Sequence, residues 1–217
     1  MKTPFSLWSL LSLIALVLPT AYLVYCWDAL PAQIPTHFDA NGQANGFTAK
    51  ESMWWLCLAL PLGMYALLHF LPRFDPKKQL SGTSVNYQKL QFLLVAMLSG
   101  VSLYSLYVAQ HAGTPPGSGL AVILGLFFAL LGNYLTTVPQ NYFVGIRTPW
   151  ALESTIIWAR THRLGGYLFF GVGLLSAGLA FWSAPVATTV LVAGVLGTVV
   201  ATYVYSYYLY RQMLNAA

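Results

Sequence analysis

Long apolar runs alternate with short polar segments along this chain. Six of the runs are long enough to cross about 30 Å of hydrocarbon as helices, because a helix rises about 1.5 Å per residue. They cover Phe5–Trp27, Met53–Leu71, Leu90–Gln110, Gly119–Val138, Leu164–Phe181 and Val186–Tyr208. This pattern predicts an all-α membrane protein, a six-transmembrane-helix bundle with three spans in residues 1–110 and three in residues 111–217.

The first and the last two runs need separate interpretation. Lys2 followed by an apolar stretch is also found in secretory signal peptides, but this run is longer than the roughly 7–15 apolar residues typical of one. Bulky Tyr25 precedes Cys26, where a lipoprotein signal needs a small residue. We therefore interpret Phe5–Trp27 as an uncleaved span. The fifth and sixth runs are separated by a tight turn, and Pro185 is well placed to begin the last helix.

Composition supports a lipid environment for this chain. Hydrophobic residues make up 58% and charged residues 7% of the sequence, and the mean hydropathy is +0.65, whereas soluble domains carry roughly 25% charged residues. The net charge of +5 does not indicate nucleic-acid binding, because the basic residues are spread over short loops. With six spans, Lys50 falls on one side and all other Lys and Arg on the opposite side. This bias predicts a multi-pass membrane protein with both termini in the cytoplasm.

The one long loop on the predicted outer side covers residues 28–52. Its Asn41-Gly42 and Asn45-Gly46 pairs favour turns, because both residue types tolerate positive φ. Pro31 and Pro35 stiffen the approach to these pairs. We therefore expect a short ordered loop, with a hairpin lying over the bundle as one form of it.

Two questions about the outer side stay open from the sequence. His37 and Asp39 could gather with Asp28 and Glu51 around a metal, or could hydrogen-bond within the turn. We favour hydrogen bonding and predict no metal and no cofactor, because no second histidine is near. Cys26 and Cys57 lie close to the outer ends of their spans, and could form a disulfide or remain two free thiols.

The polar stretch between the fourth and fifth runs, Asn141–Arg163, concentrates charge and tryptophan in an otherwise apolar region. Thr148 followed by Pro149 is typical of a helix start, with the threonine as N-cap. The residues that follow predict an interfacial helix along the inner leaflet, ahead of the fifth span. This stretch and its approach hold our candidate binding residues, which are Asn133, Asn141, Arg147, Thr148, Trp150, Trp158, His162 and Arg163; His37 and Asp39 are the outer-loop candidates.

These polar residues allow a structural and a functional interpretation. Asn133 could join two helices or line a polar pocket open to the cytoplasm. The arginines could serve only topology and contact with lipid headgroups. Alternatively, Arg147 and His162 could fold back with Glu153 toward Asn133, with His69 nearby, to build a site for a carboxylate or phosphate. No enzyme signature and no pair of carboxylates within a span is present, so we predict no catalytic residue.

Two blocks resemble a known family. LPAQIPTHFDANGQANGFTAK (Leu30–Lys50) resembles a short membrane domain of unknown function. GNYLTTVPQNYFVGIRTPWALESTIIWARTHRLGG (Gly132–Gly166) resembles the core of the SdpI family, the immunity proteins against a sporulation-delaying toxin. The matching positions in the second block are Gly132, Asn133, Asn141, Gly145, Arg147, Thr148, Pro149, Trp150, Trp158, His162, Arg163 and Gly166.

The resemblance implies a multi-pass protein of the bacterial cytoplasmic (inner) membrane that protects the producing cell from a secreted toxic peptide. It also implies that such a protein can report the toxin by holding a transcriptional repressor at the membrane, without binding nucleic acid itself. Three hypotheses follow. The chain is an immunity or receptor-type protein without catalysis, a transporter or enzyme acting on a lipid or peptide at the inner leaflet, or a structural membrane subunit.

Overall fold

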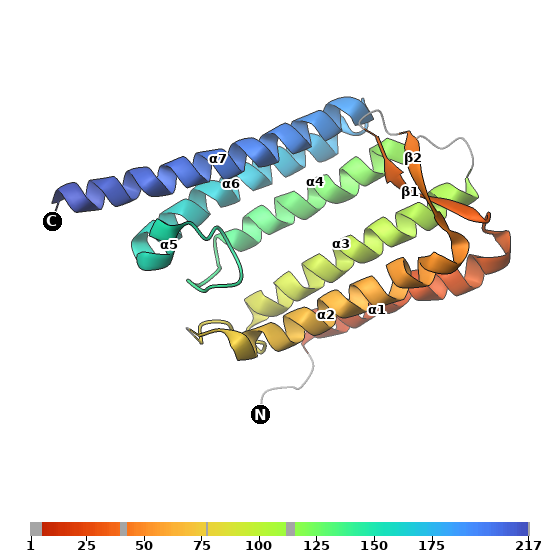
Figure 1. Ribbon diagram of the computed structural model, residues 1–217, viewed down its shortest axis with the longest axis horizontal. Helices are drawn as coiled ribbons and strands as arrows, with labels where there is room; N and C mark the ends of the chain where they lie inside the picture. Colours follow the sequence, from red (N-terminus) through yellow and green to blue (C-terminus); the bar gives the residue numbers. More distant parts are fainter. Residues whose placement is uncertain (1–5, 40–42, 77, 112–115, 217) are drawn as a thin grey trace.

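The computed structural model describes residues 6–39, 43–76, 78–111 and 116–216. Long helices run nearly parallel along the molecule (Figure 1). A two-stranded hairpin lies at one end, which we call the hairpin end. The opposite end, the loop end, carries the start of the first helix, the end of the last helix and the segment of residues 139–148, which we call the inner segment.

The N-terminal part of the chain contains α1 (Leu7–Cys26), the hairpin, α2 (Leu60–Phe70) and α3 (Val85–Gln110). Ser6 caps α1, because its hydroxyl accepts a hydrogen bond from the backbone N–H of Ser9. A 3₁₀ turn at Lys50–Ser52 and a π-helical turn at Trp55–Ala59 precede α2, and a 3₁₀ turn at Leu71–Phe74 follows it. Together these turns and α2 form one long apolar segment.

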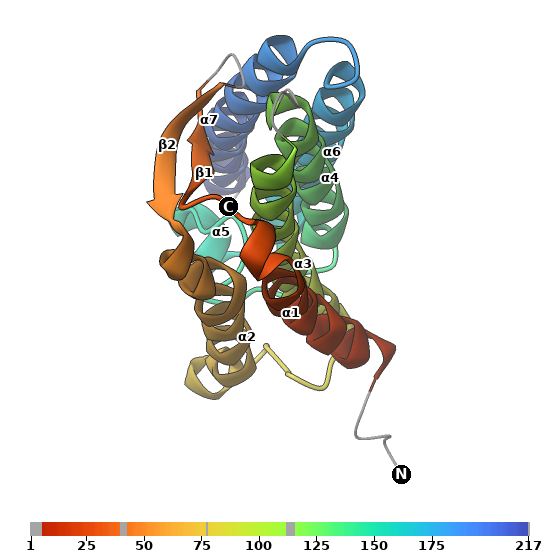
Figure 2. The ribbon, with the colours of Figure 1, turned by 90° about the vertical axis from the view of Figure 1, so that its right-hand side faces the viewer.

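The C-terminal part contains α4 (Pro116–Leu135), α5 (Pro149–Glu153), α6 (Thr155–Leu179) and α7 (Ala184–Ala216). Pro185 lies in the first turn of α7, as the sequence predicts. Viewed onto the hairpin end, α1, α2 and α3 group on one side, and α4, α6 and α7 on the other (Figure 2). α3 and α4 pack against each other and join the two groups.

The all-α membrane fold is confirmed. Among the described residues, five helical segments are long and apolar enough to cross a membrane: Leu7–Ala29, Lys50–Phe74, Val85–Gln110, Gly117–Leu135 and Ala184–Asn215. The fifth predicted span, Leu164–Phe181, lies mostly in α6, which is 25 residues long and packs between α4 and α7. α6 is not one of these five segments, and it contains the polar His162 and Arg163 and several glycines.

The interfacial helix is shorter than the sequence indicates. α5 ends at Glu153, and Ser154 adopts an extended conformation (φ −128°, ψ 123°) before α6 begins. Its hydroxyl accepts a hydrogen bond from the Ile157 N–H at 3.4 Å, so Ser154 caps α6. The residues from Thr155 onward therefore continue directly into the fifth span. They do so because one buried stripe, which includes Ile157, Thr161, Gly165, Phe169, Gly173 and Ala177, runs along the whole helix.

Glycines allow α4 and α6 to approach each other closely. A Cβ added at Gly132 would overlap the backbone of α6 at Phe170 N and Gly166 O, and one added at Gly166 would lie 2.7 Å from Gly132 O. Gly125 and Gly173 form a second contact of the same kind, one heptad along both helices. In lipid, helix association depends on such close packing, because there is little hydrophobic gain from helix contact.

The outer loop forms the expected hairpin. β1 (Gln33–Phe38) pairs antiparallel with β2 (Ala44–Ala49). The Asn41-Gly42 turn lies outside the described residues. Asn45-Gly46 does not form a turn but lies within β2, opposite His37, where the strand register shifts. A bulge of this kind accommodates glycine because the strands approach closely, and a Cβ at Gly46 would lie 2.7 Å from the Cβ of His37.

The hairpin is attached to the bundle by a buried apolar cluster. Ile34 of β1 is fully buried and packs with residues of α1, α3 and the segment before α2. Cys26 and Cys57 both belong to this cluster, and both are free thiols in the structure. Trp27 and Trp54 lie here with ring centroids 5.9 Å apart. The sequence places both tryptophans at the outer interface.

Candidate functional site: the inner segment and the α3–α4 pocket

The inner segment has no helix or strand, and a single side chain organises its backbone. Asn141 is fully buried. Its amide nitrogen donates to the carbonyl oxygens of Pro139 at 2.8 Å and Val144 at 3.0 Å. Its side-chain oxygen accepts from the N–H groups of Phe143 at 2.8 Å and Val144 at 2.7 Å. These four bonds satisfy backbone groups of a half-buried segment that has no backbone ladder.

His162 of α6 holds the next part of the segment. Its Nε2 lies 3.0 Å from the backbone nitrogen of Ile146, and its Nδ1 lies 2.9 Å from the carbonyl oxygen of Trp158. Because an N–H group can donate only to an unprotonated nitrogen, Nε2 is the acceptor and Nδ1 carries the proton. The ring is buried and stacks on Trp158 at a centroid distance of 4.0 Å. His162 is therefore a neutral clamp that joins the inner segment to α6.

Two neighbours complete this clamp. The indole N–H of Trp158 donates to the carbonyl oxygen of Val138 at 2.9 Å, at the start of the inner segment. Gly145 has φ +116°, which side-chain-bearing residues rarely adopt, and a Cβ there would overlap Nε2 of His162. The sequence gives no clue to this contact beyond the glycine itself, since Gly145 and His162 are brought together only by the fold.

The residues that follow attach the segment to α5 and α7. Thr148 is the N-cap of α5, as predicted, and accepts from the Ala151 N–H at 3.2 Å. Trp150 packs against Tyr203 and Tyr207 of α7, with centroid distances of 5.2 and 5.0 Å. Gln140 donates to the carbonyl oxygens of Ala151 and Leu152 at 2.8 and 3.0 Å. The sequence does not indicate a role for Gln140, because a lone glutamine in a loop has no distinguishing pattern.

The arginines point away from this buried core. Arg147 is exposed, and its Nη1 donates to the carbonyl oxygen of Tyr142 at 2.5 Å. Beside it, residues of α4, α6, α7 and the inner segment line a largely apolar groove of about 430 Å³. Arg163 is exposed on α6 and, with Arg160 and Thr155, lines a separate shallow depression.

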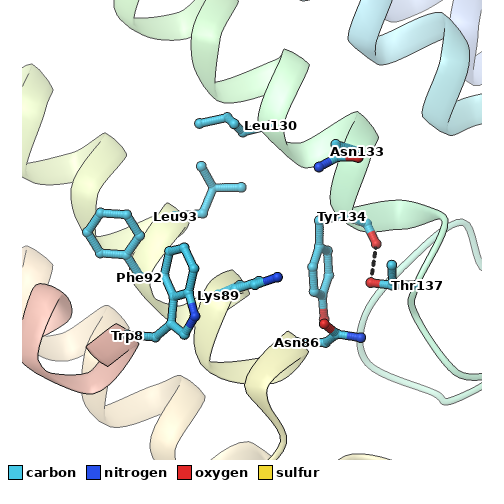
Figure 3. A pocket seen from close by; sticks show the side chains of 9 residues that line it. All are labelled: Trp8, Asn86, Lys89, Phe92, Leu93, Leu130, Asn133, Tyr134 and Thr137. Carbon is cyan, nitrogen blue, oxygen red and sulfur yellow. Dashed lines mark hydrogen bonds between the residues drawn. The ribbon is translucent and has the colours of Figure 1, made fainter. Parts of the chain in front are cut away.

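Asn133 faces a different part of the molecule. It lines a pocket of about 230 Å³ between α1, α3 and α4, which we call the α3–α4 pocket (Figure 3). The other lining residues are Trp8, Asn86, Lys89, Phe92, Leu93, Leu130, Tyr134 and Thr137. The structure thus does not gather Asn133, Arg147 and His162 into one site. His69 and Glu153 are exposed, and neither lines the α3–α4 pocket.

The outer-loop candidates hydrogen-bond within the hairpin. Nδ1 of His37 lies 2.5 Å from the side-chain oxygen of Asn45, and Asp39 accepts from the Gln43 N–H at 2.9 Å. Within the described ranges, no three His, Cys, Asp or Glu side chains lie close enough to hold a metal ion. His37 and Asp39 thus pair with residues of the hairpin itself.

Comparison with known proteins finds relatives for both blocks of the sequence. Residues 137–206 match the SdpI/YfhL protein family, and residues 14–63 match a domain of unknown function, DUF1648. The chain is 22% identical over 205 residues to the immunity protein SdpI of Bacillus subtilis (strain 168), covering 94% of this chain and 97% of that protein. No solved structure matches the chain. The resemblance to the SdpI family, with the domain of unknown function ahead of it in the order expected, is therefore confirmed.

Proposed function

We propose that this protein is a non-catalytic immunity protein of the cytoplasmic membrane that protects its cell from a membrane-active peptide. The observation that carries the proposal is the similarity to immunity protein SdpI, which extends over nearly the full length of both chains. It includes the hairpin, the bundle and the inner segment together. A shared role of the whole architecture explains this better than a shared local site.

The distribution of charge supports an orientation with the loop end in the cytoplasm. Among described residues, Lys50 is the basic residue at the hairpin end. The basic residues at the loop end are Arg73, Lys78, Lys89, Arg147, Arg160, Arg163 and Arg211. Since Lys and Arg accumulate in cytoplasmic loops, the termini are cytoplasmic and the hairpin faces outward in this proposal.

The hairpin is the surface that we propose meets the toxin. Phe47 of β2 is 58% exposed, and His37 lies on the exposed part of β1. An ordered hairpin with an exposed aromatic side chain can bind an amphipathic peptide at little cost in conformational entropy. Such a peptide reaches the hairpin before it reaches the helices.

A challenge experiment tests the immunity role. The gene is deleted, restored, and restored as Phe47→Ser, and growth is measured against candidate secreted peptides. Phe74→Ser is the matched control, because Phe74 is 69% exposed at the loop end. We expect deletion to sensitise the cells, and Phe47→Ser at normal abundance to restore less resistance than Phe74→Ser. Unchanged sensitivity of the deletion strain to every peptide contradicts the proposal.

The loop end is the surface that we propose holds a cytoplasmic repressor. Arg147, Arg160 and Arg163 are exposed there, and fixed guanidinium groups suit acidic side chains of a partner. A fluorescent fusion of a repressor encoded beside the gene tests this. We expect membrane fluorescence after toxin addition in the restored strain, and its loss when Arg160 and Arg163 are both changed to Gln. Cytosolic fluorescence under all conditions contradicts the repressor role but leaves the immunity test unaffected.

A further inference from the structure

The α3–α4 pocket combines unused polar groups with an apolar wall. In the part of the chain that the structure describes, the side chains of Asn86, Lys89 and Asn133 form no hydrogen bond or ion pair with protein. Nζ of Lys89 lies 5.4 Å from the ring centroid of Trp8, a cation–π contact that leaves its N–H donors available. No acidic side chain lines the pocket. An ammonium and two amides without an internal counter-charge favour an anionic ligand.

The apolar side of the pocket continues along one face of α4. Leu130 lines the pocket and is 54% exposed, and Leu126, one turn earlier, is 46% exposed. Residues four apart lie on the same face of a helix, so these leucines form an apolar track from the pocket toward the middle of the bundle. Trp8 and Phe92, with ring centroids 5.8 Å apart, form the opposite wall. Figure 3 shows Lys89 and Asn133 projecting into the space between these walls.

From this arrangement we propose that the α3–α4 pocket binds the headgroup of an anionic phospholipid of the adjacent leaflet. The phosphate contacts Lys89, Asn86 and Asn133, and an acyl chain lies along Leu130 and Leu126. The volume of about 230 Å³ is below the roughly 300–1,000 Å³ of sites that enclose small molecules. It suits a headgroup whose chains remain in the membrane. Basic pockets between membrane helices are known to hold anionic headgroups in this way.

A lipid bound in the α3–α4 pocket contacts both halves of the chain. Trp8 and Lys89 belong to the N-terminal half, residues 1–110, whereas Asn133 and Tyr134 belong to the C-terminal half, residues 111–217. We propose these halves as the two units of the protein, joined mainly through α3 and α4. A lipid in the pocket bridges the two units on the side of the bundle where α1 and α4 both flank α3. This proposal does not depend on the immunity role.

Native mass spectrometry of the detergent-purified protein tests the proposal. The probes are phosphatidylglycerol, phosphatidylcholine with the same acyl chains, and inorganic phosphate. We expect one tightly retained phosphatidylglycerol, with weaker binding of phosphatidylcholine and none of free phosphate. Lys89→Gln should weaken phosphatidylglycerol binding about fivefold, since one surface Lys contributes about that factor, and Lys89→Arg should retain it.

Two further variants separate this site from general charge effects. Lys78→Gln makes the same charge change at the loop end away from the pocket, and should leave retention of the lipid unchanged. Asn133→Leu removes an amide from the pocket and should also weaken binding. Equal loss in Lys78→Gln and Lys89→Gln overturns the proposal, because binding is then a property of the whole surface. Equal retention of phosphatidylcholine and phosphatidylglycerol overturns it too. Binding of inorganic phosphate without binding of phosphatidylglycerol also overturns it, because the pocket is then an anion site that holds no lipid.

Discussion

The hairpin and the inner segment both connect long helices, but they are held in different ways. The hairpin has a backbone ladder between β1 and β2, and side chains such as His37 and Asn45 only add to it on an exposed surface. The inner segment has no ladder. Buried side chains, above all Asn141 and His162, satisfy its backbone instead. A ladder tolerates changes of side chain, whereas a segment held by side chains does not.

Asparagine, histidine and glycine each contribute to how both segments are held, which provides matched pairs of variants. Asparagine is represented by Asn141 and Asn45, and histidine by His162 and His37. For glycine, the matched positions are Gly145 and Gly46. The same substitution in each member should be costly in the inner segment and mild in the hairpin. Unfolding in mixed detergent micelles, followed by tryptophan fluorescence, measures the difference.

The largest effect is expected for Asn141→Ala. Removing the amide leaves four partly buried backbone groups without this partner, each worth about 1–3 kcal/mol where water does not replace it. We expect a loss of about 3–5 kcal/mol in the free energy of unfolding, or a failure to accumulate in the membrane. Asn45→Ala, which removes an exposed partner of His37, should cost under about 1 kcal/mol. Equal costs for the two variants would show that the buried amide is not what holds the inner segment.

A smaller loss is expected for Gly145→Ala. Alanine is strained at φ +116°, at a cost of about 1–3 kcal/mol, and its methyl group displaces Nε2 of His162. We expect a loss of about 2–4 kcal/mol. Gly46→Ala also meets a histidine side chain, but on an exposed strand that can shift, so its cost should be less than half as large. If Gly46→Ala lost more stability than Gly145→Ala, the strained glycine position would be the one in the hairpin.

His162→Phe should be milder again. Phenylalanine keeps the stacking on Trp158 but cannot accept from the Ile146 N–H, which is then buried without a partner, at about 1–3 kcal/mol. We expect a loss of about 2 kcal/mol and faster proteolysis at the inner segment. His37→Phe should change stability by under about 1 kcal/mol, because that ring is exposed. A His162→Gln variant that restores an acceptor should recover part of the loss. No recovery would argue that the ring packs there without a specific bond.

The smallest effects on stability are expected for the charged side chains at the two ends of the bundle. Arg147→Gln removes one exposed hydrogen bond to Tyr142, and Lys50→Gln removes a cation–π contact with Trp27 at 4.6 Å. Each should cost under about 1 kcal/mol, since both side chains are in contact with water. A loss of function in Arg147→Gln at normal stability would indicate a contact with a partner. A loss of stability comparable to Asn141→Ala would instead make Arg147 part of the framework.

The sequence alone determined the class of the protein and its elements. Apolar runs separated by short polar loops predict membrane helices because lipid requires an uninterrupted apolar segment about 20 residues long. The Thr148-Pro149 start of α5 and the outer hairpin also follow from local chemistry, since capping and turn formation depend on neighbours in the chain. The two family blocks could be recognised for the same reason: their residues are close together in sequence.

The tertiary structure alone decided how the polar residues are used. Asn133, Arg147 and His162 are near one another along the chain, yet they face a pocket, the surface and the buried core. The direction in which each points is set by the helix or loop that carries it and by the Gly132–Gly166 contact, and not by sequence separation. Lys89 and Asn133 line the same α3–α4 pocket because α3 and α4 pack against each other. Local pattern specifies which side chains are polar, but only packing specifies which of them meet.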